Sequence, residues 1–380
     1  MKLLFAPDSF KGTLSAEEVC RIWEEEARAA MPGATCRALP VADGGEGMVR
    51  ALYGALGGEL VTVTARGPLG APVAAQYALL PDGSAAIEMA AASGLPLLRP
   101  EERDPSKTST FGTGELILDA VGRGARRIVL GLGGSATNDG GMGVGEALGV
   151  RYYDGTGSEL PSCGGAAGRV ARIDPSGIPQ ELLDVEFLIA CDVDAPLCGE
   201  RGASFVFGPQ KGAGEEMVRA LDAGLYNLGK RTEEACGKEL ICRPGMGAAG
   251  GMALPLAAFF KTEIKSGLEV VLDAQGFDAL AEWADCIITG EGCTDSQSAM
   301  GKVVAGIGKR AKALHKPVAV LSGAVEEDAQ ALSAMGVTAL FAAVHCARPL
   351  EWQLAHAKEN LRFAARQLFS LMAALGKVSE

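Results

Sequence analysis

Glycine-rich turns that directly follow short apolar runs constrain the fold of this chain more than any other sequence feature. Glycine accounts for 52 of the 380 residues, about twice its usual share of ~7%. The glycines cluster in short loops, and several of these loops lie between a strand-length apolar run and a stretch with helical spacing of apolar residues. A strand, a turn and a helix repeated in this order predict parallel sheets with helices on their faces.

The distribution of the predicted strands divides the chain into two domains. A chain of 380 residues is long for one core, because domains commonly hold about 100–200 residues. Strand–loop–helix units occupy both ends, whereas residues 73–80 and 85–89 are strand candidates joined by a short turn, which favours antiparallel pairing. We therefore predict a doubly wound, Rossmann-like or flavodoxin-like α/β domain with a parallel sheet, formed by residues 1–66 and 285–380. A second α/β domain with a mixed sheet, residues 67–284, is expected to be inserted into it.

Charge, hydropathy and cysteine content argue against several functional classes. The chain has 35 Lys and Arg against 47 Asp and Glu, a net charge of −12, so neither nucleic acid nor a membrane surface is expected as a partner. No apolar run approaches the ~18 residues of a membrane span, and the N-terminal run is too short for a signal peptide. The ten cysteines include no Cys-x-x-Cys pair, and the three histidines disfavour a zinc site. These features predict a soluble, cytoplasmic protein, either a monomer or a homodimer.

Polar loops follow the predicted strands where ligands bind in open α/β sheets, outside the carboxyl ends of the strands. We expect a cleft between the two domains to collect these loops. The terminal domain contributes Asp8, Ser9 and Lys11, then Asp43, Gly44, Gly45 and Glu46, and then Glu291 and Asp295; the inserted domain contributes Gly133, Gly134, Ser135, Asn138 and Asp192.

The residue types in these loops favour phosphoryl transfer. Glycine loops expose backbone N–H groups that cradle phosphate. Clustered carboxylates suit Mg²⁺ and a base for a hydroxyl group, and Lys11 and Lys302 supply positive charge. Together with the lack of a reactive Cys–His pair, this set describes phosphoryl transfer better than hydride or acyl transfer.

Two competing functions stay open on the residues alone. The segment from Gly245 through Gly247 to Gly250 has the G-x-G-x-x-G spelling of a dinucleotide-binding loop, which would indicate an oxidoreductase, but no acid follows at the expected ribose position. A non-catalytic sensor of a phosphorylated metabolite would use the same loops. Carboxylates around a bound phosphate oppose that reading, because they repel it unless a metal intervenes.

Five long motifs, in order along the chain, resemble those of the bacterial glycerate kinases of the glycerate 2-kinase type. They lie at residues 6–15, 43–47, 131–141, 244–251 and 290–302. The resemblance implies two α/β domains, one inserted in the other, and ATP- and Mg²⁺-dependent phosphorylation of D-glycerate. It favours 2-phosphoglycerate as the product, with 3-phosphoglycerate as the alternative.

The resemblance also suggests roles for the candidate residues, which we state as hypotheses. Asp192 or Asp43 would orient and deprotonate the glycerate hydroxyl, with Lys11 as a further catalytic group. The substrate would contact Asp8, Ser9, Lys11, Gly44, Gly45 and Glu46. Nucleotide phosphates would contact Gly133, Gly134, Ser135, Asn138, Gly245, Gly247, Gly250 and Lys302, and Mg²⁺ would be held by Asp43, Glu291 and Asp295.

Overall fold

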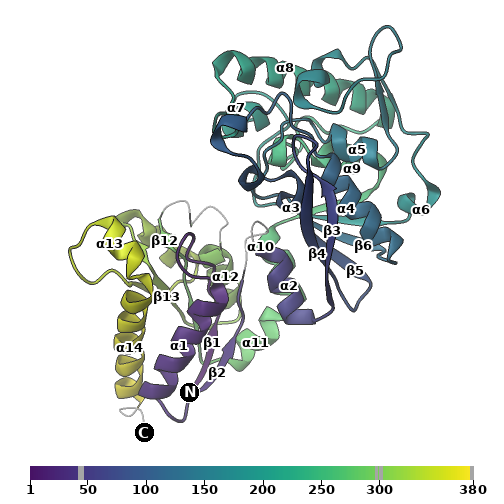
Figure 1. Ribbon diagram of the computed structural model, residues 1–380. Helices are drawn as coiled ribbons and strands as arrows, with labels where there is room; N and C mark the ends of the chain where they lie inside the picture. Colours follow the sequence, from purple (N-terminus) through teal and green to yellow (C-terminus); the bar gives the residue numbers. More distant parts are fainter. Residues whose placement is uncertain (42–46, 296–297, 299–302, 377–380) are drawn as a thin grey trace. The chain divides into compact units, whose positions relative to one another are not determined.

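The chain folds into two compact units, each built around its own sheet (Figure 1). The computed structural model describes residues 1–41, 47–295, 298 and 303–376. Unit 1 comprises Met1–Asp43 and Leu268–Glu380, and unit 2 comprises Gly44–Gly267. Unit 2 is therefore one continuous stretch of chain that interrupts unit 1.

Unit 1 has a five-stranded sheet in the order β15–β13–β11–β1–β2, and every neighbouring pair is parallel. Counted along the chain, this is the order 2-1-3-4-5 of the flavodoxin-like doubly wound fold, which confirms the predicted fold class. The strands are β1 (Lys2–Phe5), β2 (Thr35–Ala38), β11 (Cys286–Thr289), β13 (Val318–Ser322) and β15 (Ala339–Ala342); β12 (Cys293–Thr294) and β14 (Ala324–Val325) form a separate short pair.

Helices cover both faces of the unit 1 sheet because neighbouring strand residues point to opposite sides. Leu321 packs in one apolar cluster with α1 and α14, whereas the adjacent Val320 packs with α12 and the turn at Glu327–Met335. The helices are α1 (Ala16–Ala30), α10 (Gly267–Ala274), α11 (Phe277–Trp283), α12 (Val303–Ala313), α13 (Leu350–Ala355) and α14 (Ala357–Gly376).

Local sequence signals explain where α1 begins. The Ser15 hydroxyl accepts a hydrogen bond from the Glu18 amide at 3.2 Å, and the Glu18 carboxylate accepts one from the Ser15 amide at 3.0 Å. This reciprocal capping box satisfies two backbone donors that the first turn of a helix leaves unpaired. The Ser-x-x-Glu spacing therefore fixes the first residue of the helix.

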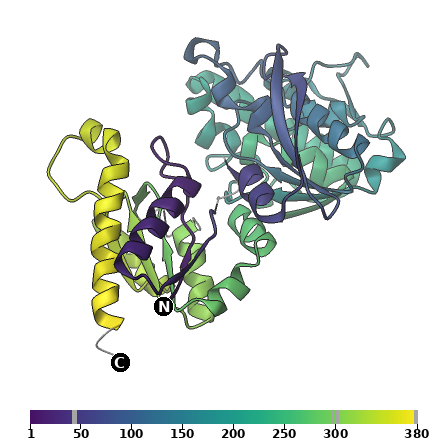
Figure 2. The ribbon, with the colours of Figure 1, turned by 60° about the horizontal axis from the view of Figure 1, so that its bottom comes forward.

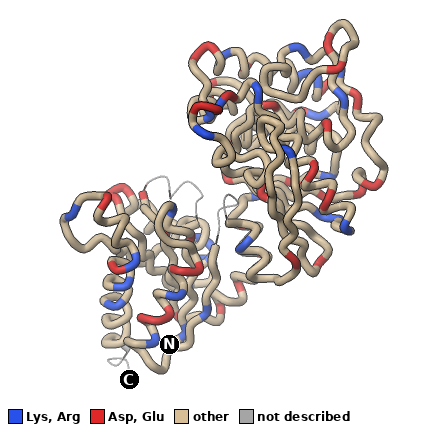
Figure 3. The backbone as a smooth tube through the Cα atoms, viewed as in Figure 1, with Lys and Arg blue, Asp and Glu red and all other residues tan. Residues whose placement is uncertain are grey.

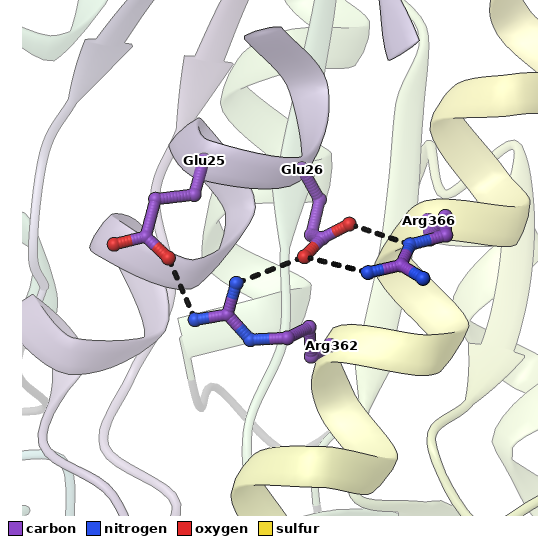
Figure 4. Close-up of polar contacts among 4 residues, drawn as sticks. All are labelled: Glu25, Glu26, Arg362 and Arg366. Carbon is purple, nitrogen blue, oxygen red and sulfur yellow. Dashed lines mark hydrogen bonds and ion pairs between the residues drawn. The ribbon is translucent and has the colours of Figure 1, made fainter. Parts of the chain in front are cut away.

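A buried carboxylate joins α1 to α14, which lie side by side in Figures 1 and 2. Glu26 is only 4% exposed, and its two oxygens contact Arg362 Nη1 and Arg366 Nε, both at 2.9 Å (Figure 4). Glu25 contacts the other terminal nitrogen of Arg362 at 2.6 Å. The guanidinium groups lower the pKa of Glu26, first through the hydrogen bond from Arg366. The carboxylate is therefore held in its charged form where burial alone would oppose it.

Unit 2 has a six-stranded mixed sheet in the order β10–β9–β6–β5–β4–β3. Pairing is parallel from β10 to β5 and antiparallel from β5 through β4 to β3. The strands are β3 (Glu59–Arg66), β4 (Pro72–Leu79), β5 (Ser84–Glu88), β6 (Arg127–Gly131), β9 (Glu186–Ala190) and β10 (Lys261–Lys265); β7 (Arg151–Tyr153) and β8 (Arg172–Asp174) pair separately. The helices are α2 (Met48–Leu56), α3 (Ala90–Ser93), α4 (Phe111–Gly122), α5 (Met142–Ala147), α6 (Gln180–Leu183), α7 (Ala203–Phe207), α8 (Glu215–Cys236) and α9 (Ala253–Phe259).

The observed unit boundaries differ from the predicted ones at residues 66 and 285. β3, expected in the terminal domain, pairs with β4 over its whole length, from Glu59 with Leu79 to Arg66 with Pro72. Residues 268–284, expected in the inserted domain, belong to unit 1. The C-terminal stretch at 351–374, whose apolar spacing predicts one long helix, is instead divided, because α13 ends at Ala355 and α14 begins at Ala357.

Positions of Lys and Arg and of Asp and Glu are distributed along the backbone of each unit, as Figure 3 shows. None of the described helices combines the length and the apolar character needed to cross a bilayer.

Candidate functional site

A pocket of about 510 Å³ lies at the carboxyl ends of the unit 1 strands. Its walls come from the loops that follow β1, β11, β13 and β15, together with α13 and the start of α14. The strand order reverses between β1 and β11, and such a reversal is where open α/β sheets bind ligands. The topology of unit 1 therefore predicts a ligand site where the pocket is found.

The structure brings five of the predicted site residues together in this pocket: Asp8, Ser9, Lys11, Glu291 and Asp295. The loops after β1 and β11 meet directly, since the Asp8 amide donates to the Gly290 carbonyl at 2.9 Å. Asp8 and Glu291 are buried, whereas Lys11 is exposed. Because β1 and β11 are neighbours in the sheet, the Lys11 ammonium and the Glu291 carboxylate line one pocket although they lie 280 positions apart in sequence.

Hydroxyl groups fix the loop that carries Glu291. Its amide donates to the Ser322 hydroxyl at 3.1 Å, and its carboxylate accepts from the Thr294 hydroxyl at 3.3 Å. These two hydroxyls are themselves 2.7 Å apart. Their bonds link the ends of β11 and β13 and hold the carboxylate at the pocket wall.

Glycine is required in this loop because backbones approach closely. A Cβ on Gly290 would lie 2.1 Å from the Leu321 carbonyl oxygen, and one on Gly323 would lie 2.4 Å from the Gly292 carbonyl oxygen. Real Cβ atoms do not approach other atoms so closely. The Gly290-Glu291-Gly292 motif therefore packs the strand ends together and places the acid between them.

The donor set of the pocket fits Mg²⁺ in type. Asp8, Glu291 and Asp295 present carboxylate oxygens, although Asp295 also accepts a hydrogen bond from the Ser298 amide at 3.0 Å. Within the described residues, no three His, Cys, Asp or Glu side chains cluster closely enough to enclose a metal ion. Mg²⁺ is usually held by one or two carboxylates plus water and substrate phosphates, so these carboxylates suit an ion that arrives with a phosphate ligand.

Several predicted site residues lie outside the residues that the structure describes: Asp43, Gly44, Gly45, Glu46 and Lys302. Asp43, the third predicted metal ligand, is among them.

The predicted loop of Gly133, Gly134, Ser135 and Asn138 follows β6 in unit 2. Gly134 has a φ of 70°, and its carbonyl accepts from the Leu95 amide at 2.8 Å. The Asn138 side chain is fully buried and donates to the Ser204 hydroxyl at 2.9 Å. Asn138 therefore anchors the loop to α7 inside unit 2.

Two buried charged groups, Asp139 and Lys211, lie in this part of unit 2. Asp139 is one of the clustered carboxylates that the sequence places in the strand-end loops, whereas Lys211 was not predicted as a site residue. The Asp139 carboxylate accepts from the amide and hydroxyl of Thr110, both at 2.8 Å, and from the amides of Gly141 and Gly143, both at 3.1 Å. Complete burial nevertheless raises the pKa of Asp139. The Lys211 ammonium donates to the Thr137 carbonyl at 2.7 Å, and burial lowers the pKa of Lys211 to about 7. A lysine within a Gly-Pro-Gln-Lys-Gly turn carries no sequence signal of burial.

Local geometry in unit 2 accounts for the glycines at 245, 247 and 250. A Cβ on Gly247 would lie 2.2 Å from the Pro196 carbonyl oxygen, and one on Gly250 would lie 2.2 Å from that of Thr137. Gly245 has a φ of 85°, a conformation that favours glycine. Residues 237–247, all of them described, contain no strand, so the strand that precedes the glycine loop in a dinucleotide-binding motif is not formed here.

Asp192 follows β9, as predicted, and contacts the start of α10. Its carboxylate accepts from the Ser266 hydroxyl at 2.5 Å and from the Gly267 amide at 3.1 Å. A carboxylate at a helix N-terminus satisfies unpaired amides and interacts favourably with the helix dipole. The geometry therefore gives Asp192 a capping contact besides any chemical role.

Comparison with known proteins gives matches over nearly the whole chain. A family model described as "Glycerate kinase family" matches residues 3–373. A protein named glycerate kinase from Bacillus subtilis (strain 168) is 45% identical over 369 residues, 97% of each chain. One named glycerate 2-kinase from Escherichia coli (strain K12) is 42% identical over 374 residues, 98% of each chain. A crystal structure from Salmonella typhimurium LT2, provisionally named glycerate kinase 2, is 43% identical with a TM-score of 0.87 over 99% of both chains.

Proposed function

The chain belongs to the glycerate kinase family, and we propose that it transfers the γ-phosphoryl group of ATP to D-glycerate in a Mg²⁺-dependent reaction. The main support for this proposal is the near-complete alignment with proteins named glycerate kinase and glycerate 2-kinase. The lysine and carboxylates at one pocket of unit 1 support it, because phosphoryl transfer relies on such charges. We propose 2-phosphoglycerate as the product, in line with the relative named glycerate 2-kinase.

We assign charge neutralisation to Lys11 and, when Mg²⁺ is bound, metal contact to Glu291 and Asp295. Mg²⁺ would supply charge compensation between the phosphate oxygens and these carboxylates. The Lys11 ammonium, assisted by the Ser9 hydroxyl, would hold the transferring phosphoryl group and stabilise its charge in the transition state. The buried position of Glu291 among hydroxyl groups supports this assignment, because it fixes the carboxylate before the ligand arrives.

Two carboxylates are candidates for the base that deprotonates glycerate, Asp192 and Asp43. Substitution separates catalysis from helix capping at Asp192. If Asp192 is the base, Asp192→Asn and Asp192→Ala both abolish turnover. If it only caps α10, Asp192→Asn keeps an acceptor oxygen and retains activity, whereas Asp192→Ala loses stability by about 1 kcal/mol. The second pattern would assign the base to Asp43, which Asp43→Asn then tests.

For nucleotide phosphates we retain the loop of Gly133, Gly134 and Ser135 as a proposed contact. It follows β6 at the carboxyl edge of the unit 2 sheet, and glycine there lets backbone N–H groups approach an anion. The close backbone contacts of Gly247 and Gly250 give those glycines a packing reason, so the proposal does not depend on them.

³¹P NMR of the purified protein with ATP, MgCl₂ and D-glycerate tests the proposed reaction, with a matched sample lacking Mg²⁺. A new phosphomonoester signal at the position of 2-phosphoglycerate, present only with Mg²⁺, is the expected result. A signal at the position of 3-phosphoglycerate would keep the kinase but change the hydroxyl that is phosphorylated. Binding of ATP without any product would refute glycerate kinase activity and favour a phosphometabolite sensor.

A further inference from the structure

The unit 1 pocket is larger and more apolar than a three-carbon acid requires. Its volume of about 510 Å³ lies in the range of sites that hold much larger ligands, roughly 300–1,000 Å³. Besides the charged residues described above, it is lined by Phe10, Val344, Leu350 and Leu354. Glycerate has no apolar group that would use such a wall.

Most of the apolar lining follows other strands than Asp8 and Lys11 do, although Phe10 lies between these two residues and Glu326 also lines the pocket. Asp8 and Lys11 follow β1, whereas Val344 follows β15, three strands away in the sheet. Strands lie about 4.8 Å apart, so the strand ends that border the pocket extend over about 14 Å. An elongated ligand with an anionic end and an apolar end matches this division.

Exposed leucines form the apolar wall on α13. Leu350 and Leu354 are separated by one helical turn and are 71% and 51% exposed, yet both line the pocket. Side chains four residues apart lie on the same face of a helix. A flat heterocycle would cover both, and apolar surface gathered at a pocket in this way is a sign of ligand binding.

A fixed pair of amides lines the same pocket. Gln353 Nε2 donates to the Cys346 carbonyl at 2.7 Å, which orients the amide so that Gln353 Oε1 accepts from Asn360 Nδ2 at 2.8 Å. Asn360 is 96% buried, being 4% exposed, and no group in the described part of the chain donates to its Oδ1. Asn360 therefore offers an acceptor oxygen beside its second N–H donor, both in fixed orientation.

We propose that this pocket binds the adenine base of the nucleotide, with Asn360 at the base edge, Leu350 and Leu354 against its face, and the phosphates toward Lys11. An amide that accepts through oxygen and donates through nitrogen matches the N6 amino group and N7 of adenine. The inference rests on the proposed phosphoryl transfer for the identity of the ligand, and it adds where the base binds.

Calorimetric titration of the full-length protein with ADP and Mg²⁺ tests the proposal without turnover. The Leu354→Gln variant should weaken ADP binding about tenfold, because an apolar contact worth roughly 1.5 kcal/mol is lost. Leu371→Gln is the matched control, since Leu371 on α14 is 52% exposed and does not line the pocket; its ADP affinity should stay within about twofold of wild type. Asn360→Leu should weaken the binding of ADP more than that of GDP, because guanine presents two acceptors, O6 and N7, on this edge and offers no donor to Asn360 Oδ1.

Steady-state kinetics then separates this inference from the proposed function. In the Leu354→Gln variant, the KM for ATP should rise while the KM for D-glycerate and kcat stay close to wild type. A rise in the KM for D-glycerate with unchanged ADP affinity would refute the base site and leave the kinase assignment intact. Equal wild-type affinities for ADP and GDP would also refute it. ADP binding that depends on Leu354, in a protein that does not phosphorylate glycerate, would support the base site and refute the proposed reaction.

Discussion

Replacing Glu26 by glutamine should destabilise unit 1 by an amount that its contacts allow us to estimate. Its carboxylate accepts three hydrogen bonds, one from Arg362 at 2.9 Å and two from Arg366 at 2.9 and 3.4 Å. Glutamine keeps one acceptor oxygen but turns an amide nitrogen toward a guanidinium group. Hydrogen bonds to charged groups contribute about 1.5–3 kcal/mol each, but Arg366 is 60% exposed and can return to water. We therefore expect a net loss of about 2–3 kcal/mol.

Tryptophan fluorescence can follow unit 1 alone, because the three tryptophans of the chain, Trp23, Trp283 and Trp352, all lie in it. For a unit of about 150–250 residues, the predicted loss lowers Tm by roughly 4–12 °C. Glu25→Gln is the control. Glu25 is 48% exposed and has one ion pair to Arg362, so its replacement should cost less than about 1 kcal/mol.

The pH dependence gives a second readout of the same interaction. The arginines lower the pKa of Glu26 in the folded protein, so the carboxylate contributes its full stabilisation above the pKa of the unfolded chain, about 4.3. That stabilisation is lost as pH falls through the lower folded-state pKa. The stability difference between wild type and Glu26→Gln should therefore be constant near neutral pH and shrink in acid. A difference below about 0.5 kcal/mol at neutral pH, or one that grows in acid, would refute this reasoning.

Three further substitutions test other parts of the structure. Lys11→Ala should lower kcat by about 100-fold or more with an unchanged circular dichroism spectrum, because a transition-state charge contact is removed; a rate within a few-fold of wild type would exclude Lys11 from the reaction. Gly290→Ala should destabilise unit 1 by about 3 kcal/mol or prevent its folding, since its Cβ would meet a carbonyl oxygen at 2.1 Å, whereas Gly33→Ala, with open space around it, should change denaturant stability by less than about 0.5 kcal/mol. Between the folded pKa of Lys211, about 7, and its higher unfolded value, only the unfolded chain holds the extra proton, so stability should rise with pH. Scanning calorimetry of wild type and Lys211→Met should show this rise only in wild type; the same slope in both would refute it.

The fold of unit 1 and the charged part of its pocket could be predicted from the sequence, because both depend on local patterns. Strand-end loops at Asp8 and Glu291 follow from apolar runs, and the rule that ligands bind at carboxyl ends indicates one edge. The pairing of Glu59–Arg66 was not predictable in the same way. An apolar, β-branched strand fits either sheet, and its antiparallel partner at Pro72–Leu79 decides which one it joins.

The contact between the Gln353 and Asn360 amides could not be predicted from the sequence, for a geometric reason. In a continuous helix over residues 351–374, positions 353 and 360 would be about 10.5 Å apart along the axis. The break at His356 between α13 and α14 instead brings the two amides to 2.8 Å. Burial of Lys211 depends likewise on tertiary contacts, here with Thr137, 74 residues away.

The interruption of unit 1 by unit 2 sets an order for folding during synthesis on the ribosome. β1 is made first, but one of its two neighbours in the sheet is β11, where Leu3 pairs with Cys286. Unit 2 is continuous from Gly44 to Gly267 and has all of its strands before the second half of unit 1 emerges. β1 and β2 therefore form only an incomplete sheet with exposed apolar residues until β11 and β13 have been translated. The long connection between β2 and β11 must then close, and closure of so long a loop slows folding. The last-made helix, α14, then completes the core over α1.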